Sequence, residues 1–195
     1  MTAPDEPTTS AAAGDAPPDP AEEAFRRGLV LLYDEEDVEG AEAAWVTADG
    51  LGHAGAATHL GLVAFHERRD VAAAEAAYAR GAERGDGNGA FHLGLLCEMR
   101  GDLEGAEAAF AQGDALGHGG AAANLGVSLH ERGEVDEAAA AFARADERGH
   151  PGGAFNLGVI LEARGDAAGA LAAYGRAHQR GEAGADDAIR RLQAG

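Results

Sequence analysis

Apolar and polar residues recur along this chain in a block of about 33 residues. Each block has an apolar run around a glycine, a short polar turn, an Ala-rich segment with one aromatic residue, and a Gly-rich junction. The glycines of the apolar runs are Gly28, Gly61, Gly94, Gly126 and Gly158, which are 33, 33, 32 and 32 residues apart. This period predicts five stacked helix–turn–helix units, because one helix pair cannot bury its apolar face alone.

The Ala-rich segment predicts the second helix of each unit. Its aromatic residues are Trp45, Tyr78, Phe110, Phe142 and Tyr174, and an Ala precedes each by four residues, on the same helical face. We expect the aromatics to form a continuous buried spine, and each glycine of the first helix to let that helix approach the Ala. An acidic residue ends each turn and predicts an N-cap or first-turn anion. Gly in a turn predicts a left-handed helix end.

The offsets from Gly94 to Asp102, Ala106 and Phe110 resemble those of the tetratricopeptide repeat (TPR), and the Gly-rich junctions resemble the related Sel-like repeats. The units are shorter than the family's roughly 34 residues. The resemblance implies an all-α solenoid. We expect a disordered acidic tail over 1–20, five repeats, and a polar C-terminal capping helix over 183–195. The repeats are expected at 21–53, 54–86, 87–118, 119–150 and 151–182.

Charge and composition narrow the function. The net charge is −19, and every basic residue other than histidine is Arg. The absence of Lys excludes a Walker-type phosphate loop and a Schiff-base lysine. The acidic balance argues against nucleic acid and favours a basic or neutral partner. Abundant Ala, Gly and Arg without Lys are typical of a GC-rich bacterial genome.

Cofactors and metals are not expected. Cys97 is the only cysteine, and the eight histidines lack the ligand spacing of a zinc site. His53, His118 and His150 recur in the junctions, where they are repeat decoration or partners of a helix C-terminus. No apolar stretch is long enough to span a membrane, and the N-terminus lacks a secretory signal. We therefore expect a cytoplasmic protein.

The resemblance also implies that the first helices line a concave groove. On their groove stripe, the residues two before each glycine are Arg26, His59, His92, Asn124 and Asn156. In some TPR proteins Asn at this place forms a ladder that grips a peptide backbone, and the resemblance carries that role to Asn124 and Asn156, and less directly to the other three. Further candidate contacts are Phe25, Phe65, Phe91, Met99, His130 and Phe155.

Two alternatives remain open for this stripe. Its central residues Leu29, Leu62, Leu95, Val127 and Val159 pack against the next first helix or meet a partner. The ladder residues satisfy the backbone of a neighbouring repeat or bind a peptide. The sequence favours a non-enzymatic adaptor or scaffold, expected to be a monomer, that binds a peptide or helix of another protein. The alternative function is a structural repeat protein that self-associates.

Overall fold

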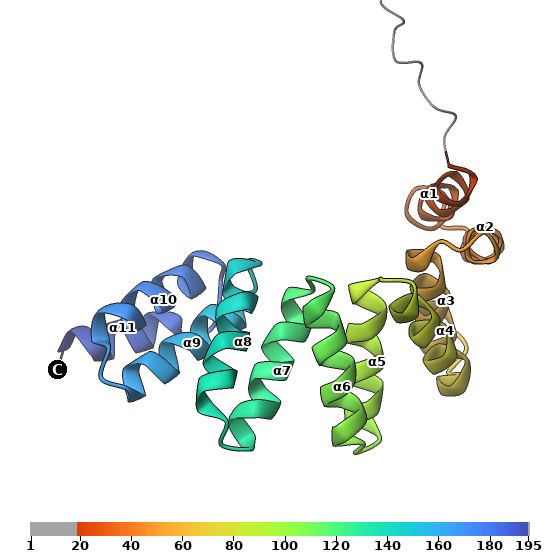
Figure 1. Cartoon of the computed structure of the whole chain (residues 1–195). Coiled ribbons are helices and arrows are strands. Elements are labelled where there is room, and N and C mark those ends of the chain that lie inside the picture. Colours follow the sequence, from red (N-terminus) through yellow and green to blue (C-terminus); the bar gives the residue numbers. More distant parts are fainter. Residues whose placement is uncertain (1–18, 195) are drawn as a thin grey trace, which may run out of the picture.

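The computed structural model describes residues 19–194, which fold into eleven α-helices with no strand among them. The helices are α1 (Pro20–Tyr33), α2 (Val38–Gly50), α3 (Ala54–His66), α4 (Val71–Glu83), α5 (Gly87–Met99), α6 (Leu103–Ala115), α7 (Gly119–Glu131), α8 (Val135–Glu147), α9 (Pro151–Ala163), α10 (Ala167–Gln179) and α11 (Ala185–Ala194). Each odd helix packs against the even helix that follows it, and α11 packs against α10. The predicted all-α solenoid of TPR-like repeats is confirmed (Figure 1).

The first helix begins slightly earlier than the sequence predicts. Asp19 accepts a hydrogen bond from the backbone N–H of Ala21 at 3.0 Å, and Pro20 is the first helical residue. Both favour a helix start, since aspartate is a preferred N-cap and proline suits the first turn. Both residues are assigned above to the tail, but Pro20 belongs to α1 and Asp19 is its N-cap. The rest of the predicted tail lies outside the described residues.

Acidic residues cap most of the second helices, as predicted. Asp37, Asp70, Asp102 and Asp166 each accept a hydrogen bond from the backbone N–H three residues further on, at 2.9–3.0 Å. Glu134 makes no such bond, and its carboxylate pairs with Arg132 at 2.5 Å. The turn glycines Gly101, Gly133 and Gly165 have φ between 74° and 82°, the left-handed conformation expected at a helix end.

A buried aromatic ring fills the centre of each repeat. Trp45, Tyr78, Phe110, Phe142 and Tyr174 are all 3% exposed or less. The predicted continuous spine is wrong, because each ring belongs to its own apolar cluster. A first helix packs between successive second helices, so Ala and Leu side chains bridge from one ring to the next.

The glycine of each first helix makes room for this ring rather than for the Ala. A Cβ atom added to Gly94 would lie 2.4 Å from Cε1 of Phe110, and one added to Gly28 would lie 2.3 Å from Nε1 of Trp45. These distances are far below ordinary contact, so the two helices of a repeat reach this spacing only with glycine at that position.

The first helices form the inner layer of the stack. α3 contacts α5, α5 contacts α7 and α7 contacts α9, whereas within residues 19–194 no two second helices approach as closely. Closer spacing in one layer bends the stack toward that layer, which makes the first-helix face concave. Figure 1 shows the first helix pair, α1 and α2, almost along its axes, whereas α5 to α8 run up the picture. The stack therefore turns between its first and second repeats.

Two sets of ion pairs join successive repeats. In the first set, an aspartate on a second helix, four residues after the aromatic, binds one arginine on the next second helix and another at that helix's C-cap. Asp114 binds Arg144 and Arg148, each at 2.5 Å. Burial raises the pKa of Asp114, but hydrogen bonds from both arginines outweigh it and hold that pKa below its usual range. The equivalent clamps are Asp49 with Arg80 and Arg84, and Asp146 with Arg176 and Arg180.

The junction between the second and third repeats lacks this clamp. Ala82 stands where the first, third and fourth repeats have aspartate, and Gln112 stands where the second, fourth and fifth repeats have the first arginine. A single hydrogen bond from Gln112 Nε2 to the carbonyl oxygen of Ala82, at 3.0 Å, replaces the ion pairs.

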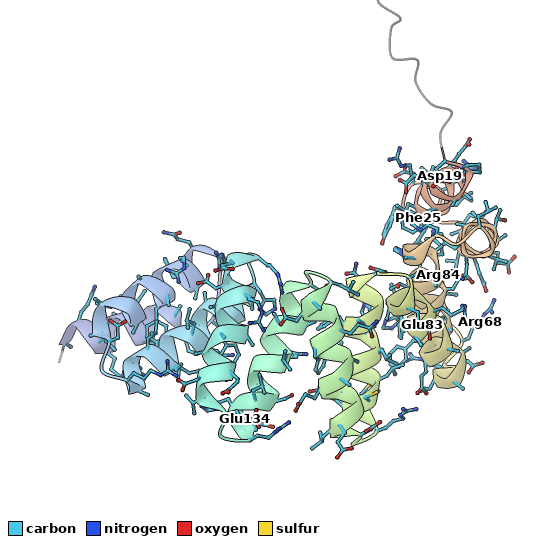
Figure 2. The ribbon with its side chains drawn as sticks, in the orientation of Figure 1. Asp19, Phe25, Arg68, Glu83, Arg84 and Glu134 are labelled. Atoms are coloured by element: carbon cyan, nitrogen blue, oxygen red, sulfur yellow. The ribbon has the colours of Figure 1, made fainter. Side chains whose placement is uncertain are left out.

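In the second set, the arginine at or just after the end of a first helix pairs with an acid on the preceding second helix. The pairs are Arg68 with Glu42, Arg100 with Glu75, Arg132 with Glu107, and Arg164 with Asp136. Figure 2 labels Arg68 at the outer edge of the stack. Within the described residues, no helix is both long and apolar enough to cross a membrane.

Candidate partner-binding groove

The ladder positions lie on five successive first helices along the inner layer. Arg26 is on α1, His59 on α3, His92 on α5, Asn124 on α7 and Asn156 on α9. Arg26 is exposed, and the other four are partly buried. The structure therefore brings these residues into one row, although their side chains differ in what they bind.

Two of the five already have polar partners on their own helix. Arg26 pairs with Glu22 at 2.6 Å, and Nδ1 of His59 hydrogen-bonds the carbonyl oxygen of Gly55 at 2.9 Å. His92 stacks on Tyr78 with ring centroids 5.1 Å apart. Burial lowers the pKa of His92, with a smaller contribution from His118, which favours its neutral form.

Asn124 and Asn156 differ from these three. Neither side-chain amide makes a hydrogen bond to any residue in the described part of the chain, and neither is fully enclosed. Each amide offers two donors and an acceptor. Within residues 19–194 they therefore do not satisfy the backbone of a neighbouring repeat.

The three phenylalanines that precede the ladder positions take part in packing. Phe25 stacks on His53 with ring centroids 4.2 Å apart, and Phe91 stacks on His118 at 4.5 Å. Figure 2 shows Phe25 where the first helix pair meets the rest of the stack. Phe155 lies against Tyr174 at 5.4 Å. All three are partly buried, so only part of each ring is left for a partner.

The histidines on which Phe25 and Phe91 stack have a role that the sequence interpretation missed. Nδ1 of His53, His118 and His150 accepts a hydrogen bond from a backbone N–H in the first turn of α3, α7 and α9, at 3.0–3.2 Å. They are therefore N-caps, and their interpretation as partners of a helix C-terminus is wrong. Asp86 has the same role on α5. Aspartate is a preferred N-cap, so its presence where the other junctions have histidine was the signal for this role in the sequence.

An apolar cavity of about 240 Å³ opens between the second and third repeats. It contains three of the predicted site residues, Phe65, His92 and Met99. Met99 is 68% exposed at its rim, and Tyr78 and Leu96 are buried at 2% and 3% exposure. The remaining lining residues are His66 and Leu95.

Three further hollows follow the same face. One of about 210 Å³ between the fourth and fifth repeats is lined by His130, Glu131 and Asn156, together with Val127, Phe142, Val159 and Ile160. A larger one includes Phe25, His59 and His92, and another includes Phe155 beside α11. Arg26, Phe91 and Asn124 line none of these four. The residues of the central stripe differ in exposure. Leu29, Leu62 and Leu95 are partly buried, whereas Val127 and Val159 are 40% and 42% exposed.

Among residues 19–194, no group of three or more His, Cys, Asp or Glu side chains is placed to hold a metal ion. What the inner face offers is a row of polar side chains, two of them unengaged amides, together with hollows that His59, His92 and Asn156 help to line. That arrangement suits the recognition of a chain segment, which presents both backbone polar groups and side chains.

The chain thus has the architecture of a helical repeat protein of the TPR and Sel1-like class. No family model and no curated protein matches its sequence. Among solved structures, it is similar to a protective antigen of uropathogenic Escherichia coli that displays an SLR fold, with a TM-score of 0.79 and 20% identity. That match covers 88% of this chain and 41% of the antigen, so this chain spans less than half of the antigen's length.

A Sel1 repeat protein from Oxalobacter formigenes matches with a TM-score of 0.69 and 20% identity, over 87% of this chain and 74% of the other. YrrB, a TPR protein with an unusual peptide-binding site, matches with a TM-score of 0.53 and 20% identity, over 89% and 92%. At these identities the similarities establish a shared fold, which confirms the resemblance to TPR and Sel-like repeats.

Proposed function

We propose that this chain is a non-enzymatic interaction module that binds a peptide or helix of another protein along its concave first-helix face. The observation that carries the proposal is the pair of amides on Asn124 and Asn156. They recur at the same place in adjacent repeats and are not engaged within the described residues. Each can exchange a donor and an acceptor with a peptide backbone.

The neighbouring side chains support the same function. His92 is held by stacking on Tyr78, and in its neutral form it has one donor and one acceptor. Met99 and His130 are exposed on the same layer, and Phe65 is partly exposed. The peptide-binding site named for YrrB shows that this fold can carry such a site.

The test uses a library of randomised short peptides displayed on phage and selected on the immobilised full chain. Selected peptides are synthesised with a fluorophore, and their affinity is measured by anisotropy. The variant is the double substitution Asn124→Ala with Asn156→Ala. The control is Gln179→Ala, which removes an exposed amide from α10, the second helix of the fifth repeat.

We expect the double variant to bind selected peptides about thirtyfold more weakly, because each of the two asparagines loses a hydrogen bond of about 1 kcal/mol. Its circular dichroism spectrum and melting temperature should remain close to those of the wild type, because neither amide bonds the rest of the described chain. Gln179→Ala should bind normally. Equal binding by the wild type and the double variant would exclude the ladder.

A further inference from the structure

The cavity between the second and third repeats differs from the other hollows of the inner face in its lining. Five of its seven lining residues are apolar or aromatic, and the other two are His66 and His92; the five are Phe65, Tyr78, Leu95, Leu96 and Met99. Its counterpart between the fourth and fifth repeats includes Glu131, His130 and Asn156 and is more polar. An apolar side chain would therefore be favoured between repeats two and three.

The volume of the cavity limits what it can accept. An apolar cavity of about 150 Å³ is enough to bind benzene. The 240 Å³ of this one is therefore sufficient for a single aromatic ring or branched aliphatic side chain. Met99, an unbranched and adaptable side chain that is 68% exposed, can close over such a group.

The charge around the cavity determines which kind of segment can bring that side chain. The chain has 34 acidic residues and 15 arginines. All the arginines but Arg69, which lies in the turn after α3, pair with carboxylates in the described structure. A large excess of negative charge therefore remains on the protein.

Part of that excess lies beside the cavity. Glu67 and Glu98 are each adjacent in sequence to a lining residue, are exposed, and make no ion pair within residues 19–194. These two carboxylates outnumber the unpaired Arg69, which lies three residues after His66. The cavity also lies near the C-terminal ends of α3 and α5, where the helix dipole is negative. A basic segment is attracted to this end of the groove, and an acidic one is repelled.

The geometry points to a specific occupant: this cavity holds one large apolar side chain of a Lys- or Arg-rich segment of a partner protein. This inference rests on the proposed function, because it adds an anchor and a charge to the segment held by the asparagine ladder. It names Phe65, Leu95 and Met99 as residues that determine specificity.

The same displayed library tests it. Selected peptides are measured against Met99→Gln, which removes the apolar rim without changing charge, and Leu95→Trp, which fills the cavity. The control is Leu103→Gln, because Leu103 is 70% exposed, like Met99, but lies at the start of α6 outside the cavity. Each peptide is also made with its large apolar residue replaced by Ser, and separately with its basic residues replaced by Gln.

We expect the selected peptides to share one large apolar residue close to two or more basic ones. Met99→Gln, Leu95→Trp and the Ser peptide should each weaken binding about tenfold, the effect of one buried apolar side chain. The Gln peptide should also bind more weakly, and the wild-type complex should weaken with added salt. Leu103→Gln should bind as the wild type does.

A direct readout comes from the methyl group of Met99. The chain has only two methionines, Met1 and Met99, so ¹³C-methyl labelling gives a spectrum in which Met99 is easily assigned. Its signal should shift when a selected peptide binds, and should not shift with the concentration of the unliganded protein. This readout does not depend on whether Leu95→Trp folds.

Several outcomes would overturn the anchor. Peptides that bind Met99→Gln and Leu95→Trp normally but lose affinity for Asn124→Ala with Asn156→Ala would leave the groove in place and exclude the cavity. Selected peptides that are acidic or lack basic residues would exclude a Lys- or Arg-rich partner segment. A Met99 signal that shifts with protein concentration would assign the cavity to a second copy of this chain.

Discussion

Gly94 and Phe110 interlock the two helices of the third repeat, and this contact predicts an unusual effect of Gly94→Ala. Glycine inside a helix normally costs about 1 kcal/mol relative to alanine, so the substitution would ordinarily stabilise the protein. Here the new Cβ would lie 2.4 Å from Cε1 of Phe110. That ring is 0% exposed, so protein atoms surround it.

The magnitude follows from two opposing effects. Overpacking a closed core costs about 1–3 kcal/mol, and helix propensity returns about 1 kcal/mol. We expect Gly94→Ala to lower the free energy of unfolding by about 1–2 kcal/mol, since the ring is fully enclosed. The matched control is Gly175→Ala inside α10, where no atom lies within 4 Å of the added Cβ. That variant should gain about 0.5–1 kcal/mol.

A double-mutant cycle isolates the contact. Phe110→Ala alone should cost about 3–5 kcal/mol, as for other buried aromatic residues. In that background the clash is gone, so Gly94→Ala should stabilise the protein by about 1 kcal/mol. The assay is urea denaturation followed by circular dichroism of the helices, and Phe110→Leu replaces Phe110→Ala if the latter is too unstable to measure. The same loss from Gly94→Ala in both backgrounds would refute the interlock.

Other contacts give further predictions. Asp114→Asn leaves Arg144 and Arg148 without their carboxylate. It should lower the free energy of unfolding, measured by urea denaturation, by about 1–3 kcal/mol, a range reduced because the arginines are partly exposed to solvent. An unchanged midpoint would show that the clamp does not stabilise the stack. Burial lowers the pKa of His118 and of His150 below 6.5, so the unfolded chain takes up protons first and stability should fall as the pH drops from 7 toward 5. His118→Asn keeps a side-chain acceptor for the cap and should make melting temperature less dependent on pH in this range, whereas an unchanged dependence would exclude His118 as a source.

Features that depend on local spacing were predictable from the sequence. The repeat period is visible in the recurring glycines. The buried aromatics and the aspartate caps such as Asp102 follow from helical geometry within about ten residues. The N-cap role of His118 was missed because histidine is not among the preferred caps. Its alternation with Asp86 at the corresponding junction position would have indicated the role.

Features that depend on how repeats are rotated against one another were not predictable. The clamp of Asp114 with Arg144 joins residues 30 positions apart, and the recurring Asp and Arg offsets in the sequence were its only signal. The apolar cavity requires Phe65 and Met99 to meet across two repeats. Their separation depends on the superhelical turn, which small differences in Gly and Ala packing at each junction determine.

The concave face is proposed to bind another protein, and site-specific photo-cross-linking in the native cell can test this claim. A photoreactive residue is placed at Val127 on the inner helix α7 or at Val135, the first residue of α8. These positions are 40% and 39% exposed, so they differ in location rather than accessibility. We predict a cross-link to one distinct partner protein from Val127 and little or none from Val135. Cross-links from Val135 alone, from neither position, or only to a second copy of this chain would contradict the claim.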